Sequence, residues 1–268
     1  MTKSLIQQQF GNKANAYATS TVHAHGASLQ RLVDLVKPRP HWRALDIATA
    51  AGHTAHAFAP HVKQVIATDI TPQMLPKARE LAAGKEISNL EPAAVDAERL
   101  PFKKNSLDLV MCRIAPHHFP DPAYFVEEVG RVLRPDGLFA LVDNIVPYKR
   151  TRRKKEQRAY ANACDYINNF EKLRDPSHAR CLTSYEWEAL FQDTGFRLIS
   201  NETMRKKMNF APWAARMDVS AEDTTRLRAM LVQAPKVVKE FLTPEIEGDT
   251  IHFYLTELIL IGKLNKSD

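Results

Sequence analysis

Three aspartates follow or end apolar segments in the first hundred positions, where a carboxylate could bind a ligand. Asp46 lies near the end of the segment that contains Leu45 and Ile47. Asp69 follows residues 62–68, and Asp96 follows residues 91–95. In an open α/β sheet, ligands lie at the carboxyl ends of the strands. Asp69 also lies about 20 residues after the small-residue turn at 48–52, the distance at which an acid reaches a ribose in nucleotide-binding units. The spacing therefore predicts a nucleoside site.

Residues 44–54 predict a strand, a tight turn and the start of a helix, with Gly52 just before the helix. Small residues at such a turn let backbone N–H groups approach a ligand closely. A dinucleotide fingerprint needs glycine at the first, third and sixth positions of the turn, where this chain has Ala48, Ala50 and His53. The pattern argues against a pyrophosphate cradle, whereas a smaller nucleoside fits the same turn.

Two adjacent histidines, His117 and His118, follow the strand expected at 107–112 and are candidate acid–base residues. A histidine exchanges a proton near neutral pH, so either side chain suits general-base catalysis. We slightly favour His117, with His118 as a competitor; the alternative is that one caps a helix and the other packs as a ring. His53 and His56 have the spacing of metal ligands on a helix, but no third ligand is indicated, so we expect no metal.

Apolar periodicity alternates between strands and helices up to about residue 145. Strands are expected near 42–47, 62–68, 91–95, 107–112 and 138–142, with helices at 4–18, 29–36, 72–84 and 122–133. This alternation predicts a doubly wound α/β fold with a parallel sheet. A charged helix at 148–174 interrupts the pattern, which resumes with 183–194, a strand at 196–203, mixed helix and loop at 204–248, and a final strand at 250–264. An insertion of this kind commonly covers a pocket.

The composition is that of an ordinary soluble protein, with 268 residues of which 44% are hydrophobic and 25% charged. We find no apolar run long enough for a membrane span and no signal peptide, so a cytoplasmic location is expected. The three cysteines fit neither a disulfide framework nor a zinc site, and we expect reduced thiols. Of the net charge of +6, much lies at 149–158, where seven basic residues accompany one acid. A solvated helix face is favoured there over a patch for acidic ligands or nucleic acid.

Four motifs together resemble the Rossmann-like S-adenosylmethionine-dependent methyltransferases, most closely those of ubiquinone and menaquinone biosynthesis. They are the runs at 44–53, 67–75 and 96–102 and the segment at 125–141, which contains Arg-Val-Leu-Arg-Pro-Asp-Gly at 131–137. The resemblance implies a mostly parallel seven-stranded sheet with helices on both faces, an antiparallel last strand and a helical insertion over the pocket. We expect N-terminal helices or a lid at 1–40, a Rossmann-like cofactor-binding core at 41–147 and the insertion at 148–182. The rest of the same sheet would occupy 183–268, with a substrate-side region at 204–248.

The resemblance implies a role for each matching position. The turn at 46–52 would receive the methionine part of S-adenosylmethionine, and Asp69 would accept hydrogen bonds from both ribose hydroxyls. The family usually has glycine where Ala48 and Ala50 stand. Phe10 and Tyr17, seven residues apart on one face of a polar helix, would form a lid or anchor that helix to the core. The full set of candidate cofactor residues is Phe10, Tyr17, Asp46, Ala48, Thr49, Ala50, Gly52, Asp69, Ile70, Met74, Asp96, Ala97 and Arg113. Ile70 and Met74 would lie beside the adenine and Asp96 on its amino group, and Arg113 would contact the cofactor or the substrate.

The predicted function is methyl transfer from S-adenosylmethionine to a small-molecule acceptor, with the nucleophilic O, C or N atom open. His117 or His118 would take up a proton, and Arg174 and His178 are hypothetical acceptor contacts. An alternative is a Rossmann-like binding protein or enzyme that transfers no methyl group. An RNA methyltransferase ranks lower, because no appended RNA-binding module is evident. The sequence does not indicate an oligomeric state.

Overall fold

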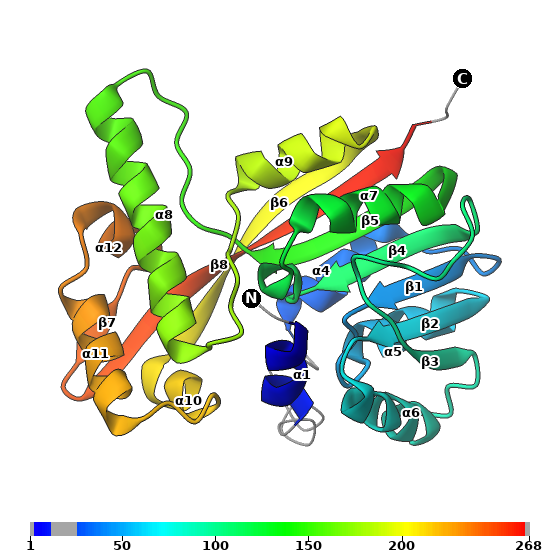
Figure 1. Ribbon diagram of the computed structural model, residues 1–268, viewed down its shortest axis with the longest axis horizontal. Helices are drawn as coiled ribbons and strands as arrows, with labels where there is room; N and C mark the ends of the chain where they lie inside the picture. Colours follow the sequence, from blue (N-terminus) through cyan, green and yellow to red (C-terminus); the bar gives the residue numbers. More distant parts are fainter. Residues whose placement is uncertain (1–2, 12–25, 266–268) are drawn as a thin grey trace. The chain divides into compact units, whose positions relative to one another are not determined.

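The computed structural model describes residues 3–11 and 26–265, which form two compact units (Figure 1). Of the described residues, the first unit comprises 3–11, 26–143, 188–202 and 259–265, and the second comprises 144–187 and 203–258. The strands β6 and β8 contribute residues to both units. No helix among the described residues is long and apolar enough to cross a membrane.

An eight-stranded sheet runs in the order β3, β2, β1, β4, β5, β8, β6, with the short β7 paired to β8. The strands are β1 Arg43–Ile47, β2 Gln64–Asp69, β3 Leu90–Ala94, β4 Leu107–Arg113, β5 Leu133–Asn144, β6 Phe196–Asn209, β7 Glu245–Glu247 and β8 Thr250–Leu264. Pairing is parallel from β3 through β5. Helical segments connect β1 to β2, β2 to β3 and β4 to β5, as parallel neighbours require a crossover, whereas residues 95–106 connect β3 to β4 without a helix. The α/β class and mostly parallel sheet are as predicted; β7 is the strand beyond the seven expected.

Helices cover both faces of the sheet in the first unit, with α7 and α9 on one face and α4 on the other (Figure 1). Its helices are α1 Lys3–Gly11, α4 Ala27–Val36, α5 His53–Phe58, α6 Leu75–Ala83 and α7 Pro122–Val132, together with most of α9 Ser184–Asp193. Three 3-10 turns, η1 Ala59–His61, η2 Pro72–Met74 and η3 Pro116–His118, lie in the connections. Asp121 caps α7 by accepting from the amides of Ala123 and Tyr124, and Pro122 follows at the first helical position.

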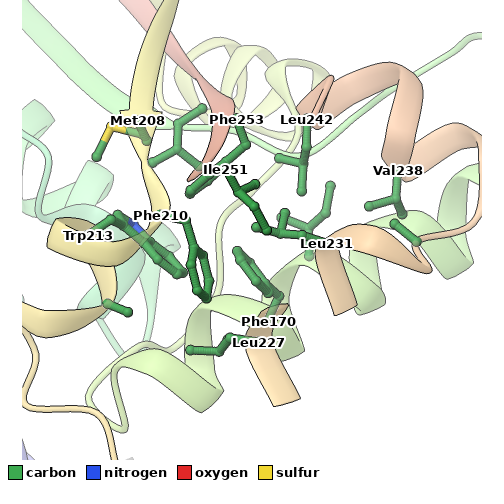
Figure 2. Packing of buried hydrophobic residues seen from close by; sticks show 14 of the residues in the cluster. Phe170, Met208, Phe210, Trp213, Leu227, Leu231, Val238, Leu242, Ile251 and Phe253 are labelled. Atoms are coloured by element: carbon green, nitrogen blue, oxygen red, sulfur yellow. The ribbon is translucent and has the colours of Figure 1, made fainter. Parts of the chain in front are cut away.

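The second unit has its own apolar core (Figure 2). Its helices are the long α8 Lys154–Arg174, α10 Phe210–Ala215, α11 Ala221–Val232 and α12 Lys236–Leu242. Phe170 on α8 stacks on Trp213, with ring centroids 4.9 Å apart, and Phe253 on β8 meets both rings edge-on. Leu227, Leu231, Val238 and Leu242 complete the packing from α11 and α12. The insertion and residues 203–258 therefore form one unit around a shared core.

Candidate functional site

Parallel register brings four polar side chains to one edge of the sheet in the first unit. Asp46 pairs with Ala67 of β2 and Met111 of β4, and Asp69 ends β2. Arg113 ends β4 and pairs with Val142, one residue before Asp143 on β5. Since all these strands run in one direction, their carboxyl ends meet at one edge, where ligands bind in folds of this class.

Asp46 holds the turn after β1 together. Its Oδ2 accepts from Thr49 Oγ1 at 2.5 Å and from the amide of Ala55 at 3.0 Å, so one carboxylate oxygen ties the turn to the first helical residues. The side chain is buried, and this desolvation raises the pKa of Asp46 to about 7, even though both hydrogen bonds and the charge of Arg113 act to lower it. Asp46 therefore changes its protonation near neutral pH.

Two alanines in this turn adopt the left-handed backbone conformation. Ala48 has φ 53° and Ala50 has φ 46°. An L-residue there brings Cβ close to the following carbonyl oxygen, at a cost of about 1–2 kcal/mol per residue, which glycine avoids. The sequence identified these positions as departures from glycine, and the structure shows that the backbone keeps the conformation that glycine would adopt readily.

Replacing either alanine with glycine is expected to stabilise the protein. Ala48→Gly and Ala50→Gly each relieve the left-handed strain but add freedom to the unfolded chain, so we expect a gain of about 0.5–1 kcal/mol in the free energy of unfolding. Urea denaturation measures it. Ala51→Gly is the matched control, since Ala51 is buried in the same turn without a positive φ, and it should lose stability. Equal losses of unfolding free energy in all three variants would show that the backbone at Ala48 and Ala50 is not strained.

Gly52 combines a positive φ with close packing at the start of α5. Its φ is 87°, and a Cβ there would lie 3.0 Å from His56 Nε2 and 3.1 Å from Ala78 Cβ. Gly52→Ala should therefore cost more than the strain alone, about 2–3 kcal/mol of unfolding free energy. Gly195→Ala is the control, because Gly195 has φ 89° with no atom within 4 Å of the added methyl. Thermal and urea unfolding should show the Gly52 variant as the weaker of the two, and equal losses would exclude the packing contribution.

Asp69 links the turn after β1 to the segment after β2. Its Oδ2 accepts from the amide of Ala50 at 2.9 Å, and its Oδ1 accepts from the amide of Thr71 at 2.8 Å. Burial raises the pKa of Asp69, opposed by these hydrogen bonds. Each carboxylate oxygen can accept a further hydrogen bond, so the geometry leaves Asp69 with the capacity to bind a diol.

Helix α1 contacts the loops after β2, β3 and β4. Lys3 Nζ lies 2.5 Å from Asp96 Oδ2 and 2.7 Å from Glu98, and Gln7 donates to the carbonyl of Ile70 at 2.7 Å. The ring of Phe10 meets His118 edge-on, with centroids 5.0 Å apart. Three residues expected at the cofactor therefore take part in contacts of α1, namely Phe10, Ile70 and Asp96. Ala97 is the neighbour of Asp96 in the same loop. Met74 is fully buried beneath them, and Tyr17 lies outside the described residues.

His117 forms a buried pair with Asp143. His117 Nδ1 lies 2.6 Å from Asp143 Oδ1, and Asp143 is completely buried. The contact suits a tautomer with the proton on Nδ1, which would donate to an ionised Asp143 and leave Nε2 as the basic nitrogen. His118 packs against the ring of His117, with centroids 4.3 Å apart, and against Phe10. The two histidines therefore differ in their surroundings. Asp143 orients His117, whereas His118 packs against the rings of His117 and Phe10.

Backbone geometry positions these groups. Ile114 has φ 54°, which is rare for a β-branched residue, and its amide donates to Val142 at 2.7 Å. This bend follows Arg113, which donates to Thr54 Oγ1 at 3.1 Å, and precedes the η3 turn that carries His117. Strained conformations of this kind persist where the surrounding structure holds them, and they concentrate at functional sites.

Sequence reasoning missed two of these residues. Asp143 follows the apolar run at 138–142 near the end of β5, the same signal that identified Asp46 and Asp69, but the sequence analysis did not include it in the site. Lys3 lies 93 residues from Asp96 and gave no local signal. Arg174 and His178 lie in the second unit, where Arg174 stacks over Trp213 at 4.5 Å and His178 Nε2 lies 2.9 Å from Asn168 Oδ1. Within the described ranges, no group of three or more His, Cys, Asp or Glu is placed to hold a metal ion.

Comparison with known proteins agrees with this fold. A family model described as a methyltransferase domain matches residues 45–141. The uncharacterized methyltransferase YcgJ of Bacillus subtilis is 31% identical over 255 residues, which is 94% of this chain and 96% of YcgJ. The chain belongs to the Rossmann-like S-adenosylmethionine-dependent methyltransferases, and it transfers a methyl group from that cofactor to an acceptor substrate.

Two further comparisons show how far the similarity extends. The crystal structure of YcgJ has a TM-score of 0.81 and 30% identity, covering 91% of this chain and 100% of that chain. A demethylmenaquinone methyltransferase of Deinococcus radiodurans is 36% identical over 104 residues, which is 38% of this chain and 42% of that enzyme. The likeness to YcgJ thus extends beyond the cofactor-binding part, whereas the second covers a limited segment.

Proposed function

We propose that this methyltransferase acts on a small-molecule acceptor that loses a proton during methyl transfer, with His117 as the base and Asp143 as its positioning residue. The observation that carries the proposal is the 2.6 Å contact between His117 Nδ1 and the buried Asp143 carboxylate. That pair fixes the tautomer and ring orientation, as required for a base that takes a proton at one defined atom. Similarity to a demethylmenaquinone methyltransferase supports a small-molecule acceptor.

The edge of the sheet fits the cofactor. The small-residue turn at 48–52 would receive the methionine part, and Ala48 and Ala50 are its half-buried residues. Asp69 would accept from the ribose hydroxyls, and Ile70, Asp96 and Ala97 would lie at the adenine. When bound, S-adenosylmethionine supplies a methyl group already activated on a sulfonium. The chain must then align the acceptor and take its proton on His117 Nε2.

Variants at the histidines test the base. With an acceptor found by transfer of labelled methyl groups to a metabolite extract, His117→Asn should lower kcat by about 10²–10⁴. Asp143→Asn should lower it less and shift the pH profile, while both variants keep the affinity for S-adenosylhomocysteine. A larger loss in His118→Asn than in His117→Asn would assign the base to His118. Unchanged kcat in all three would exclude a histidine base.

Helix α1 completes the adenosine side of this site. Lys3 and Gln7 tie it to Asp96 and to the carbonyl of Ile70, so the helix must move or loosen when the cofactor exchanges. Lys3→Ala combined with Gln7→Ala should weaken S-adenosylhomocysteine binding about 3- to 10-fold, mainly through faster dissociation, because three polar contacts that hold α1 are lost. Stopped-flow displacement measures the rate. Gln8→Ala, on the exposed side of α1, is the control and should dissociate at the original rate.

A further inference from the structure

A strongly basic surface with two exposed tyrosines lies in the second unit. We name it the tyrosine–basic patch, and it consists of Tyr148, Lys149, Arg150, Arg152, Arg153, Lys154, Lys155, Arg158, Arg180 and Tyr185. Every one of these residues is exposed. They come from the loop that precedes α8, from the first turns of α8, and from the segment around the start of α9. The patch therefore gathers three chain segments of one unit.

Hydrogen bonds and ion pairs hold these segments together. Glu156 on α8 accepts from Lys149 Nζ at 2.6 Å and from Thr151 Oγ1 at 2.6 Å, and Cys164 donates to the carbonyl of Pro147 at 3.2 Å. Arg180 pairs with Glu186 near the start of α9. Those two carboxylates balance two of the eight cations, so the patch keeps a large positive excess.

The location of the cations is unfavourable for α8 itself. Lys154 and Lys155 open the helix and Arg153 is its N-cap residue, at the end where the helix dipole is positive and acids are preferred. Glu156 is the one acid in that first turn. Solvation alone gives no reason to place cations at this end of the helix. An anionic surface outside the helix would offset their repulsion by the helix dipole.

The tyrosines add an apolar component that charge alone does not explain. The rings of Tyr148 and Tyr185 stack with centroids 5.0 Å apart and planes 9° apart, yet they are 43% and 54% exposed. Tyrosine combines an apolar ring with a polar hydroxyl and is enriched where one end meets lipid and the other meets water. A paired ring beside basic residues is thus suited to a charged interface with an apolar layer beneath it.

We propose that the tyrosine–basic patch docks the protein on the surface of an anionic phospholipid membrane. Lysine and arginine are attracted to anionic headgroups, and the tyrosine rings reach the interfacial layer. A nucleic acid is the other polyanion to consider, but its bases stack on separate open aromatic faces, whereas these two rings stack on each other. The proposal concerns a surface outside the methyl-transfer site, so its test needs neither cofactor nor acceptor.

Co-sedimentation of the full chain with vesicles tests the proposal. We expect binding to phosphatidylcholine vesicles that contain phosphatidylglycerol, no binding to phosphatidylcholine alone, and release at about 1 M salt, where screening is strong. Arg150→Glu combined with Arg152→Glu should weaken partitioning at least about tenfold. Tyr148→Ser combined with Tyr185→Ser should weaken it about threefold with the salt dependence kept.

Lys103→Glu combined with Lys104→Glu is the matched control, because it makes the same charge change on an exposed loop of the first unit. This control should retain vesicle binding within about twofold. An equal loss of vesicle binding in the control would show that binding depends only on the overall charge of the protein, and it would overturn the proposal. Absent binding to anionic vesicles would overturn it as well, and so would tighter binding to a single-stranded RNA oligonucleotide. Circular dichroism of each variant confirms that a loss of binding is not a loss of folding.

Discussion

Replacing Asp69 with alanine is expected to lower the affinity for S-adenosylhomocysteine at least about 100-fold. Two charge-assisted hydrogen bonds to the ribose would be lost, each contributing about 1.5–3 kcal/mol. The same carboxylate accepts from the amides of Ala50 and Thr71, so the variant also loosens the turn that would receive the methionine part. Isothermal titration measures the affinity, and thermal unfolding shows how much stability is lost with it.

Asp108→Asn separates a specific loss of binding from a general loss of stability. Asp108 lies near the start of β4, at the opposite end of that strand from Arg113, and it accepts from the amide of Arg43 at 2.8 Å and from Arg134 at 2.8 Å. This variant should unfold more easily but bind S-adenosylhomocysteine as the parent does. Binding by Asp69→Ala within about threefold of the parent would show that Asp69 is not the ribose ligand.

Asp46→Asn is expected to change how stability depends on pH. Burial raises the pKa of Asp46 from its ordinary value near 4 to about 7, so between those values the folded state holds a proton that the unfolded state releases. Stability then falls as pH rises through this window, by up to about 1.4 kcal/mol per pH unit. The asparagine can still accept from Thr49 and Ala55 and has no charge to bury. It should therefore be more stable than the parent by a few kcal/mol at about pH 8, and the difference should vanish near pH 4.

His56 acts in the opposite direction and must be separated from Asp46. Burial lowers the pKa of His56 to about 4, so the unfolded chain binds the proton first and stability is lost as pH falls from about 6.5 towards 4. Urea denaturation of the parent, Asp46→Asn and His56→Gln between about pH 4 and 8 resolves the two contributions. A pH profile of Asp46→Asn parallel to that of the parent would contradict the raised pKa of Asp46.

The strands that position the site could be predicted because each is a short apolar run, and an acid at the end of β1 and of β2 identified the site edge. β1, β2 and β4 were located within a few residues, and their shared direction follows from the intervening helices. β5 was predicted at 138–142 because Arg-Pro-Asp-Gly at 134–137 is typical of a turn. The strand instead begins at Leu133, which pairs with Leu107 of β4. The next pair is Leu138 with Leu109, so β5 has more residues than β4 between the two pairs. The turn-like residues form an irregularity within the strand, with Asp136 at φ 67°.

Tertiary contacts explain what the sequence could not supply. A pair such as His117 and Asp143 depends on β4 and β5 being neighbours, which no local pattern determines. Lys3 reaches Asp96 only once α1 lies over the loops after the strands. The choice between His117 and His118 likewise depends on which ring meets a carboxylate and which meets Phe10. Residue types identified the candidates, and packing distinguished their environments.

The left-handed alanines have a consequence for recognising such sites in other sequences. A search that requires glycine at the positions of Ala48 and Ala50 would reject this chain, although its backbone adopts the same handedness there. In this chain the turn is defined by positive φ angles at Ala48 and Ala50, and a residue with one methyl group adopts them at a modest cost in stability. The turn is therefore recognised by its backbone conformation, which glycine adopts most easily and alanine can adopt as well.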